Sequence, residues 1–331
     1  QQGIPVEVIV FNEDGALASS IPKGVDIHNL QTKTLRRSLF PLISKLRSLK
    51  PSVVFSTFGY INVGLLLFRL LIPKDIKIWI REANLPSVSL PNNPYTPLMS
   101  LGYRMLYRIA DKIICSSKRM ADEFINDFNL PASKLHLLPN PVNEKMIQSM
   151  IVNVTDYQND RVNFIAMGRL TYQKGFDRLL QWFSNLESKE SVLRIIGSGP
   201  MEAELKDLVI QLNLSERVVF VRYIDNPWEK IAASDVFLLP SRWEGMSNAA
   251  LESLACGTPV IATAESGGIL ELSKCAKQGV VVVTSTEIEF CMGKKVPVNL
   301  GSLASLGKYG ERYPHTKVSV RINPGIGAGH H

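Results

Sequence analysis

The chain has 331 residues, of which 45% are hydrophobic and 20% are charged. This composition excludes an intrinsically disordered protein and is sufficient for two domains of ordinary size. The formal net charge of +7 admits nucleic acid, an anionic membrane surface or a phosphorylated substrate as a partner. Because the basic residues are spread along the chain without a nucleic-acid-binding motif, we do not expect nucleic acid to be a partner.

The apolar run that comes nearest to a membrane span is Val63–Ile72, which is too short and contains Arg69. A buried helix is expected there instead. The chain opens with Gln1 and soon enters an apolar stretch, so no signal peptide is expected. The four cysteines show no metal-ligand spacing and are typical of reduced thiols. Together these features predict a cytoplasmic protein.

Short apolar runs alternate with helical patterns along the first half of the chain. The expected strands are Val6–Phe11, Val53–Ser56, Ile76–Ile80, Lys112–Cys115 and Leu135–Leu138. Helices are expected between them, including Leu35–Leu49 and Tyr95–Ala110. Such alternation predicts βαβ units around a parallel sheet.

The second half repeats this arrangement. Its expected strands are Val162–Met167, Val192–Ile196, Val218–Val221, Val236–Leu239 and Pro259–Thr263. Helices with one apolar face are expected after Gly175 and after Pro200. We therefore predict an α/β fold with two doubly wound, Rossmann-like sheets, divided at 1–143 and 144–295. Ligands of such sheets bind beyond the carboxyl ends of the strands, so the site is expected in a cleft between the domains.

Two loops of the second half carry features that suit a phosphate ligand. Gly168–Gly175 holds Arg169 and Lys174, two cations that can grip a diphosphate, although two ordinary surface cations are the alternative. The loop Gly197–Pro200 precedes a helix. Its glycines let a ligand approach the backbone, and the helix start offers free amides; a simple turn is the alternative.

A third loop runs through Ser241–Glu252 into a helix. Ser247 is the expected N-cap, and the helix should end by Gly257 with Leu251, Leu254 and Ala255 facing the sheet. The helix N-terminus favours an anion. Glu244 lies in the loop, and Glu252 can point back toward a ligand, where carboxylates suit vicinal hydroxyl groups. For Glu252, a solvated helix residue is the alternative interpretation.

These motifs, taken in order, resemble family 4 of the retaining glycosyltransferases. The resemblance rests on two glutamates separated by seven residues, Glu244 and Glu252, followed by Ala255–Ala262 and Gly267-Gly268 with Glu271. Gly168-Arg169-Leu170 with Lys174-Gly175 and Ala233-Ser234-Asp235 before a strand belong to the same pattern. Together they cover roughly residues 160–275 and are specific as a set.

The resemblance implies a GT-B fold and a transfer of sugar from a nucleoside diphosphate with retention of configuration. Arg169, Lys174 and Glu244 would be catalytic, the cations on the diphosphate and Glu244 on the donor sugar. Glu252 would hold the ribose. The remaining donor-binding candidates are Gly168, Gly197, Gly199, Gly245, Met246, Ser247 and Asn248. The sequence holds no Asp-x-Asp motif, and the resemblance implies neither metal nor cofactor, with a UDP-sugar as the expected substrate.

Three residues of the first half, Arg81, Glu82 and Asn84, follow an expected strand and are acceptor-side candidates. The stretch resembles one found in bacterial family members that build surface polysaccharides, which implies a lipid-linked or polysaccharide acceptor. An ion pair at the strand end is the alternative. For Tyr103–Arg108 we expect a helix packed in the core with two cations outward, with peripheral contact to the inner face of the membrane as the alternative.

Both ends of the chain depart from the family pattern. The opening strand and helix of the first domain are missing, which predicts a gap in the sheet and exposed apolar surface. Residues 296–331 resemble a fragment of the barrel of diaminopimelate decarboxylases without its cofactor lysine motif. We therefore expect that the chain joins two gene fragments, one from a glycosyltransferase and one from a decarboxylase. An inactive nucleotide-sugar-binding fragment and a nucleotide-sugar epimerase are the alternative functions, and the paired cations and glutamates favour a transferase.

Overall fold

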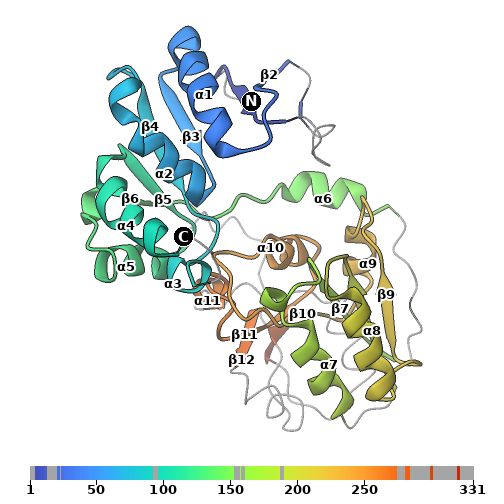
Figure 1. The fold of residues 1–331 in the computed structure, drawn as a ribbon. Coiled ribbons are helices and arrows are strands. Elements are labelled where there is room, and N and C mark those ends of the chain that lie inside the picture. The colour runs from blue at the N-terminus through green and yellow to red at the C-terminus, as the bar shows by residue number, and fades with distance from the viewer. Residues whose placement is uncertain are drawn as a thin grey trace. The chain divides into compact units, whose positions relative to one another are not determined.

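The structure is a computed structural model that describes residues 4–12, 21–22, 24–91, 96–152, 157, 161–186, 190–273, 280–283, 299–300 and 319–320. The chain forms two compact units (Figure 1). Unit 1 comprises Gln1–Ser116 and Met120–Leu138, and unit 2 comprises Ser117–Arg119 and Pro139–His331. Each unit is built around its own parallel sheet.

The main sheet of unit 1 has four parallel strands in the order β3-β4-β5-β6. They are β3 (Val53–Ser56), β4 (Lys77–Arg81), β5 (Lys112–Cys115) and β6 (Leu135–Leu137). The runs predicted as strands are confirmed here to within a residue or two at each end. The inward-facing residues Ile78, Ile80 and Ile113 are fully buried, as the near-continuous apolar pattern of a parallel strand requires.

A second, two-stranded parallel sheet in unit 1 pairs β1 (Glu7–Val10) with β2 (Asp26–Asn29). Among the described strands none pairs with both of the sheets in this unit. That this separation reflects a missing opening strand stays a prediction. The edge strand β3 exposes Val53 and Phe55, the latter to 51%. The sequence missed β2, because Asp-Ile-His-Asn lacks an apolar run.

Among the described residues of unit 1, helices pack around the main sheet. They are α1 (Leu35–Leu49), α2 (Gly59–Leu67), α3 (Pro86–Ser89), α4 (Thr96–Leu106) and α5 (Lys118–Asn126). The helix predicted over Tyr95–Ala110 ends earlier and continues as a 3-10 turn, Tyr107–Ile109. The buried helix predicted over Val63–Ile72 is right for Leu65 and Leu66 but wrong beyond Leu67, where the helix ends and Leu70 is 96% exposed.

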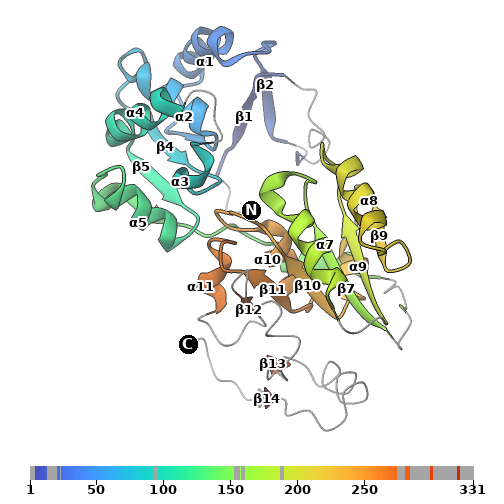
Figure 2. The ribbon, with the colours of Figure 1, turned by 60° about the horizontal axis from the view of Figure 1, so that its bottom comes forward.

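The sheet of unit 2 has six parallel strands in the order β12-β11-β10-β7-β8-β9 (Figure 2). They are β7 (Val162–Met167), β8 (Ser191–Ile196), β9 (Val218–Val221), β10 (Val236–Leu239), β11 (Val260–Thr263) and β12 (Val280–Val283). The order reverses between β7 and β10. In doubly wound sheets this switch point opens the crevice in which ligands bind.

Helices cover both faces of the unit 2 sheet. They are α6 (Glu144–Met150), α7 (Phe176–Ser184), α8 (Glu202–Gln211), α9 (Trp228–Ala232), α10 (Asn248–Ala255) and α11 (Ile269–Ser273). The apolar face predicted after Gly175 is confirmed, since its four large residues in α7 are all buried. The face predicted for α10 is right for Leu254, which packs against the core, but not for Leu251 and Ala255. Ala250 and Ser253 are buried against neighbouring elements, whereas Leu251 and Ala255 stay partly exposed.

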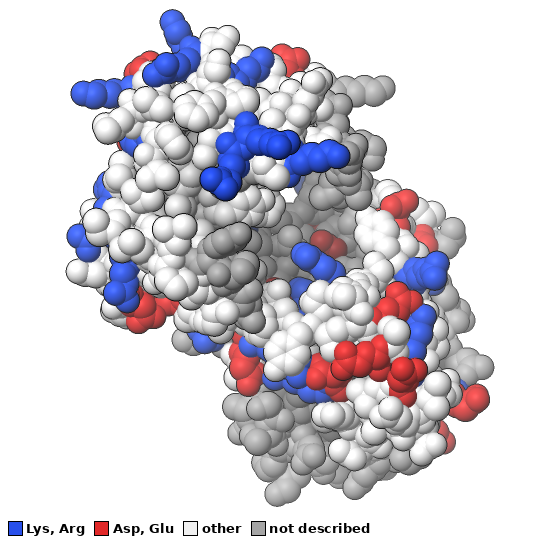
Figure 3. All heavy atoms as spheres, viewed as in Figure 1, with Lys and Arg blue, Asp and Glu red and all other residues white. Residues whose placement is uncertain are grey.

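Charged side chains are distributed differently over the two units. On the face drawn in Figure 3, Lys and Arg predominate over unit 1, whereas acidic and basic side chains are interspersed over unit 2.

Of the segment 296–331, the structure describes β13 (Asn299–Leu300), which pairs in parallel with β14 (Ser319–Val320). The rest lies outside the described residues, and the resemblance to a decarboxylase fragment stays a prediction.

Candidate active site

Two loops meet at the switch point of unit 2. Parallel strands end at the same edge of a sheet, and β7 pairs directly with β10 through Phe164 opposite Val236. The loop after β7 therefore reaches the loop after β10. The backbone N–H of Arg242 donates to the carbonyl of Gln173 at 2.8 Å, and the Gln173 amide donates to the carbonyl of Trp243 at 3.0 Å. The two loops are joined by main-chain and side-chain bonds.

The two loops place a cation against a carboxylate. Lys174 ends a 3-10 turn after β7, and its ammonium donates to Oε1 of Glu244. The hydroxyl of Ser241 donates to the same oxygen at 2.8 Å. Glu244 is only 5% exposed, and a carboxylate that is buried to this degree requires such partners. On the far side, Gly245 accepts from the N–H of Gly268 at 2.9 Å, which supports the loop that carries Glu244.

Arg169 lies on the same loop as Lys174 but is exposed. Within the described part of the chain, its guanidinium forms no hydrogen bond or ion pair. The structure therefore joins Lys174 to Glu244 and leaves Arg169 available at the surface of the loop. Contact of both cations with one diphosphate stays a prediction.

The loop that begins at Gly197 stacks on the Gly168 loop. The N–H of Gly168 donates to Ile196, and the N–H of Leu170 donates to the carbonyl of Ser198 at 2.9 Å. Gly197 has a φ of +151°, and a Cβ there would lie 1.9 Å from the carbonyl oxygen of Gly168. The close approach that this glycine permits is thus between two protein loops. Contact of Gly168, Gly197 and Gly199 with a donor stays a prediction.

The start of α10 is capped as predicted. Ser247 accepts from the N–H of Ala250 at 3.4 Å, which satisfies one of the free amides at the helix start. Asn248 is exposed and accepts from the amide of Asn140 at 2.6 Å. The same Asn140 amide donates to the carbonyl of Met246 at 3.1 Å, which fixes the entry to the helix. The remaining amides of the first turn are those that can face an anion.

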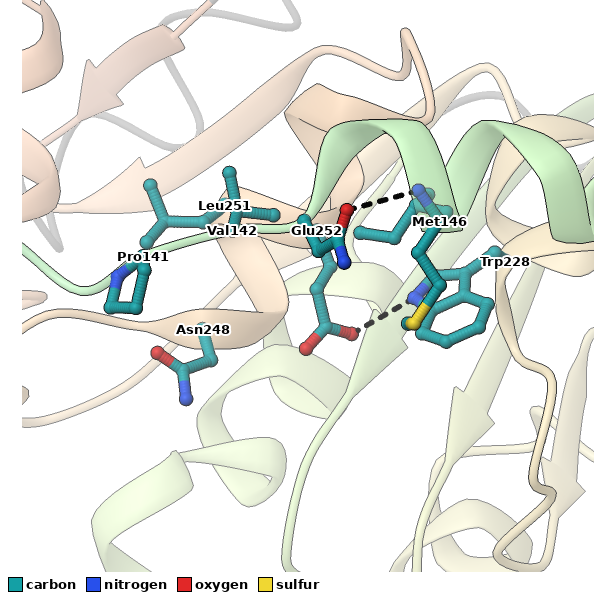
Figure 4. A pocket seen from close by; sticks show the side chains of 9 residues that line it. Pro141, Val142, Met146, Trp228, Asn248, Leu251 and Glu252 are labelled. Atoms are coloured by element: carbon teal, nitrogen blue, oxygen red, sulfur yellow. Dashed lines mark hydrogen bonds between the residues drawn. The ribbon is translucent and has the colours of Figure 1, made fainter. Parts of the chain in front are cut away.

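Glu252 faces a pocket between α6, α9 and α10, which Figure 4 shows. The pocket is lined by Pro141, Val142, Asn143, Met146, Ile147, Trp228, Asn248, Leu251 and Glu252. The indole Nε1 of Trp228 donates to Oε2 of Glu252 at 3.2 Å. Burial raises the pKa of the Glu252 carboxyl, and the bond from Trp228 opposes that rise. Because Glu252 is partly buried and bonded, its interpretation as a solvated helix residue is wrong.

The acceptor-side candidates lie at the end of β4 in unit 1. Glu82 is 6% exposed, and its carboxyl points into the core. The hydroxyl of Tyr107 donates to Oε1, and the amide of Asn62 donates to the same oxygen at 2.9 Å. Tyr103 stacks on Tyr107 with 4.4 Å between ring centroids and bonds to the Glu82 carboxyl. Arg81 and Asn84 on either side of Glu82 are half-buried.

The buried position of Glu82 changes how the acceptor-side prediction is understood. Burial raises the pKa of this carboxyl to about 7, and the bonds from Tyr107, Asn62 and Tyr103 and the charge of Arg81 oppose that rise. A carboxyl held inside unit 1 cannot contact an acceptor in this conformation. Of the three acceptor-side candidates, only Arg81 and Asn84 are partly exposed, and contact of either with an acceptor stays a prediction.

Two further findings concern metals and membranes. The residues that the structure describes hold no group of three or more His, Cys, Asp or Glu side chains that could bind a metal ion. No helix among them is both long and apolar enough to cross a bilayer.

In the segment predicted to pack in the core, Tyr103 and Tyr107 are buried while Arg104 and Arg108 are exposed, so that prediction is confirmed.

The two halves of the chain match two sequence families. Residues 1–145 match the family described as glycosyltransferase family 4, and residues 151–290 match the family described as glycosyl transferases group 1. An uncharacterized glycosyltransferase of Methanocaldococcus jannaschii is 28% identical over 245 residues, which is 70% of this chain and 60% of the relative. A Campylobacter jejuni enzyme is 28% identical over 220 residues, 66% of this chain and 60% of the relative. That enzyme is named N-acetylgalactosamine-N,N'-diacetylbacillosaminyl-diphospho-undecaprenol 4-alpha-N-acetylgalactosaminyltransferase.

The chain thus spans 60% of the length of each of these two relatives. Among solved structures, Anabaena HepE in complex with UDP has a TM-score of 0.69 at 17% identity, covering 92% of this chain and 87% of HepE. This likeness shows the fold, which is the GT-B fold expected from the sequence motifs.

The buried Glu82 carboxyl predicts a pH-dependent stability of unit 1. Its pKa in the folded chain, about 7, lies above the ordinary value of 4.5. The protonated form therefore stabilises the fold at low pH, and this contribution is lost as the pH rises from about 4.5 to about 7, by on the order of 3 kcal/mol at most. Glu82→Gln cannot ionise, so its unit 1 should lose less stability over that range. Opening free energies of β4 and β5 amides from hydrogen exchange at pH 5 and pH 8 measure this.

The matched control is Glu204→Gln, which alters an exposed glutamate of unit 2 and should leave the pH dependence of β4 and β5 as in the parent. An equal fall in stability from pH 5 to pH 8 in the parent and in Glu82→Gln would contradict the assignment.

Proposed function

We propose, from the premise that this chain is a glycosyltransferase of the family 4 type, that it transfers a sugar from a nucleoside diphosphate sugar to a lipid-linked or polysaccharide acceptor. The proposed transfer retains the configuration of the sugar and uses no metal. The observation that carries the proposal is the pair of Lys174 and Glu244 at the switch point of unit 2.

The diphosphate of the donor is proposed to bind Lys174 and Arg169. As the sugar leaves, negative charge grows on the diphosphate, and two cations beside it stabilise that charge without a metal ion. Free amides at the start of α10 add a partial positive charge. When Lys174 turns to the phosphate, Oε1 of Glu244 loses its cation and is free to accept from a hydroxyl of the donor sugar. One ion pair thus supplies both a phosphate contact and a sugar contact.

The nucleoside is proposed to lie toward Glu252. Its carboxylate borders a pocket that also contains apolar side chains, and it can accept from the two hydroxyls of a ribose. Support for uridine as the base comes from the structure of Anabaena HepE in complex with UDP. A UDP-sugar is therefore the first donor to test, with GDP as the alternative nucleotide.

The acceptor is proposed to be a lipid-linked or polymeric glycan bound near Arg81 and Asn84. Support comes from the name of the Campylobacter relative, which specifies an undecaprenyl diphosphate-linked substrate for that enzyme. A guanidinium beside an amide at a strand end suits the phosphate and hydroxyl groups of such a molecule.

A surface of α4 supports peripheral contact with a membrane on its cytoplasmic side. Leu98, Leu101 and Met105 follow one another at helical spacing and are between 56% and 66% exposed. Arg104 and Arg108 are exposed on the same segment. An exposed apolar row beside cations is typical of a helix that lies in the interface of an anionic bilayer.

Ligand-dependent unfolding tests the donor site. Uridine diphosphate at a hundred times its dissociation constant should stabilise unit 2 by about 2.7 kcal/mol, and Glu252→Ala should lose most of that shift. Glu204→Ala, which removes an exposed glutamate of α8, should keep it. A thermal shift of equal size in the parent and in Glu252→Ala would remove Glu252 from the site.

An assay of the same protein with labelled UDP-glucose distinguishes a transferase from an inactive binding fragment and from an epimerase. Transfer of label to a lipid-linked acceptor supports the proposal. Donor binding without product indicates an inactive binding fragment, and conversion of the donor without acceptor indicates an epimerase.

Co-sedimentation with vesicles tests the membrane contact. The chain should sediment with vesicles rich in phosphatidylglycerol, and Leu101→Glu should reduce the bound fraction several-fold because it places a charge in the apolar row. Ile210→Glu, the same kind of change at a 66% exposed side chain of α8, is the control and should bind like the parent. Equal binding of the parent and Leu101→Glu would exclude α4 as the contact.

A further inference from the structure

Arg242 lies two residues before Glu244 and crosses to the loop that carries Lys174. Its guanidinium donates to both carboxylate oxygens of Asp177, at 2.7 and 2.6 Å, in the paired geometry that arginine favours. It also donates to the carbonyl of Tyr172 at 2.8 Å and stacks on the Tyr172 ring at 3.8 Å. The sequence motifs did not single out Arg242 or Asp177.

These contacts leave Arg242 little capacity for a ligand. Nη1 donates to both Tyr172 and Asp177, Nη2 donates to Asp177, and one face of the guanidinium plane covers a ring. Arg169, by contrast, is exposed. The two arginines therefore have different roles, one toward the protein and one toward solvent.

We infer that Arg242 and Asp177 form a clip that positions Lys174 relative to Glu244 when the donor binds. The inference rests on the proposed function, in which Lys174 leaves Glu244 for the diphosphate. Once that ion pair opens, it can no longer hold the two loops together. The clip joins the loop after β10 to the first turn of α7, directly after Lys174, through groups that the donor does not use. It therefore keeps the cation and the carboxylate in place while both face the ligand.

The bonds of Gln173 to Arg242 and Trp243 also join the two loops, and they too are made by groups that the proposed donor does not contact. Arg178 of α7 donates to the carbonyls of Pro240 and Ser241 at 2.7 and 2.6 Å, at the point where the second loop leaves β10. Arg178 therefore anchors the base of that loop. Arg242 instead reaches the turn that ends in Lys174, through Tyr172 and Asp177.

The ionisation states suit a permanent clip. Burial opposes ionisation of Asp177, but the hydrogen bonds and charge of Arg242 outweigh it and lower the pKa of that carboxyl. The hydrogen bonds from Arg242 to Asp177 in turn raise the pKa of the guanidinium. Both groups are charged across the physiological range. The pair is partly exposed, so we expect it to act through geometry more than through stability of the fold.

The test compares nucleotide affinity with local loop order. Arg242→Ala and Asp177→Ala should each bind uridine diphosphate about ten-fold more weakly by calorimetry, with little change in melting temperature. Because both residues act as one unit, the double variant should be about as weak as either single variant. Arg242→Lys keeps the charge but not the two-point geometry, and it should resemble Arg242→Ala more than the parent. In all of them, hydrogen exchange at the amides of Lys174, Gly175 and Arg242 should be faster.

Arg194→Ala is the matched control. Arg194 also combines a side-chain hydrogen bond, to Asn163 at 2.9 Å, with a stacked ring, Tyr157 at 3.6 Å, but it lies in β8 away from both loops. Its loss should leave nucleotide affinity and loop exchange as in the parent. The clip is overturned if Arg242→Ala binds like the parent, if the two single effects add in full, or if Arg194→Ala weakens binding as much.

Failure of the proposed function gives a different result. If the parent binds neither uridine nor guanosine diphosphate, the donor assignment fails, and the exchange measurement still decides the clip. Faster exchange at Lys174 and Gly175 in Arg242→Ala but not in Arg194→Ala supports it, and unchanged exchange overturns it.

Discussion

The pairing of β7 with β10 brings together the two loops that carry the candidate site. Parallel strands that are far apart in sequence are placed side by side, so the loops that follow them meet at one edge of the sheet. Each loop brings one half of an ion pair, Lys174 from one and Glu244 from the other. The clip of Arg242 and Asp177 and the anchor of Arg178 reinforce that meeting. The charges of the site are thus a consequence of strand order.

Three buried or partly buried carboxyls show how the environment assigns different roles to one chemical group. Glu244 is matched by an ammonium and a hydroxyl, so its charge is compensated inside the protein. Glu252 receives one indole N–H in a pocket that also contains apolar side chains. Glu82 has two tyrosines and an amide as partners, and burial raises its pKa to about 7. Glu82 is therefore suited to support the end of β4, whereas Glu244 and Glu252 border the places where a ligand can bind.

Much of this arrangement could be predicted from the sequence. The strands are apolar runs of four to six residues, so β3 and β7 were located closely, and Ser247 was identified as an N-cap from its type and place. The features that the sequence did not predict are set by tertiary contacts. The polar strand β2 has no apolar signal, and Leu251 of α10 borders a pocket instead of the core. Trp228 reaches Glu252 from 24 residues away, and Asp177 reaches Arg242 from 65, so no local pattern reveals either contact.

We propose that the donor diphosphate binds at the Lys174–Glu244 pair. A crystal structure of the chain with uridine diphosphate tests it most directly. We expect phosphate oxygens within hydrogen-bonding distance of the Lys174 ammonium, with Glu244 separated from that ammonium and the Arg242–Asp177 contacts intact. Uridine diphosphate bound elsewhere on the chain, with Lys174 still paired to Glu244, would contradict it.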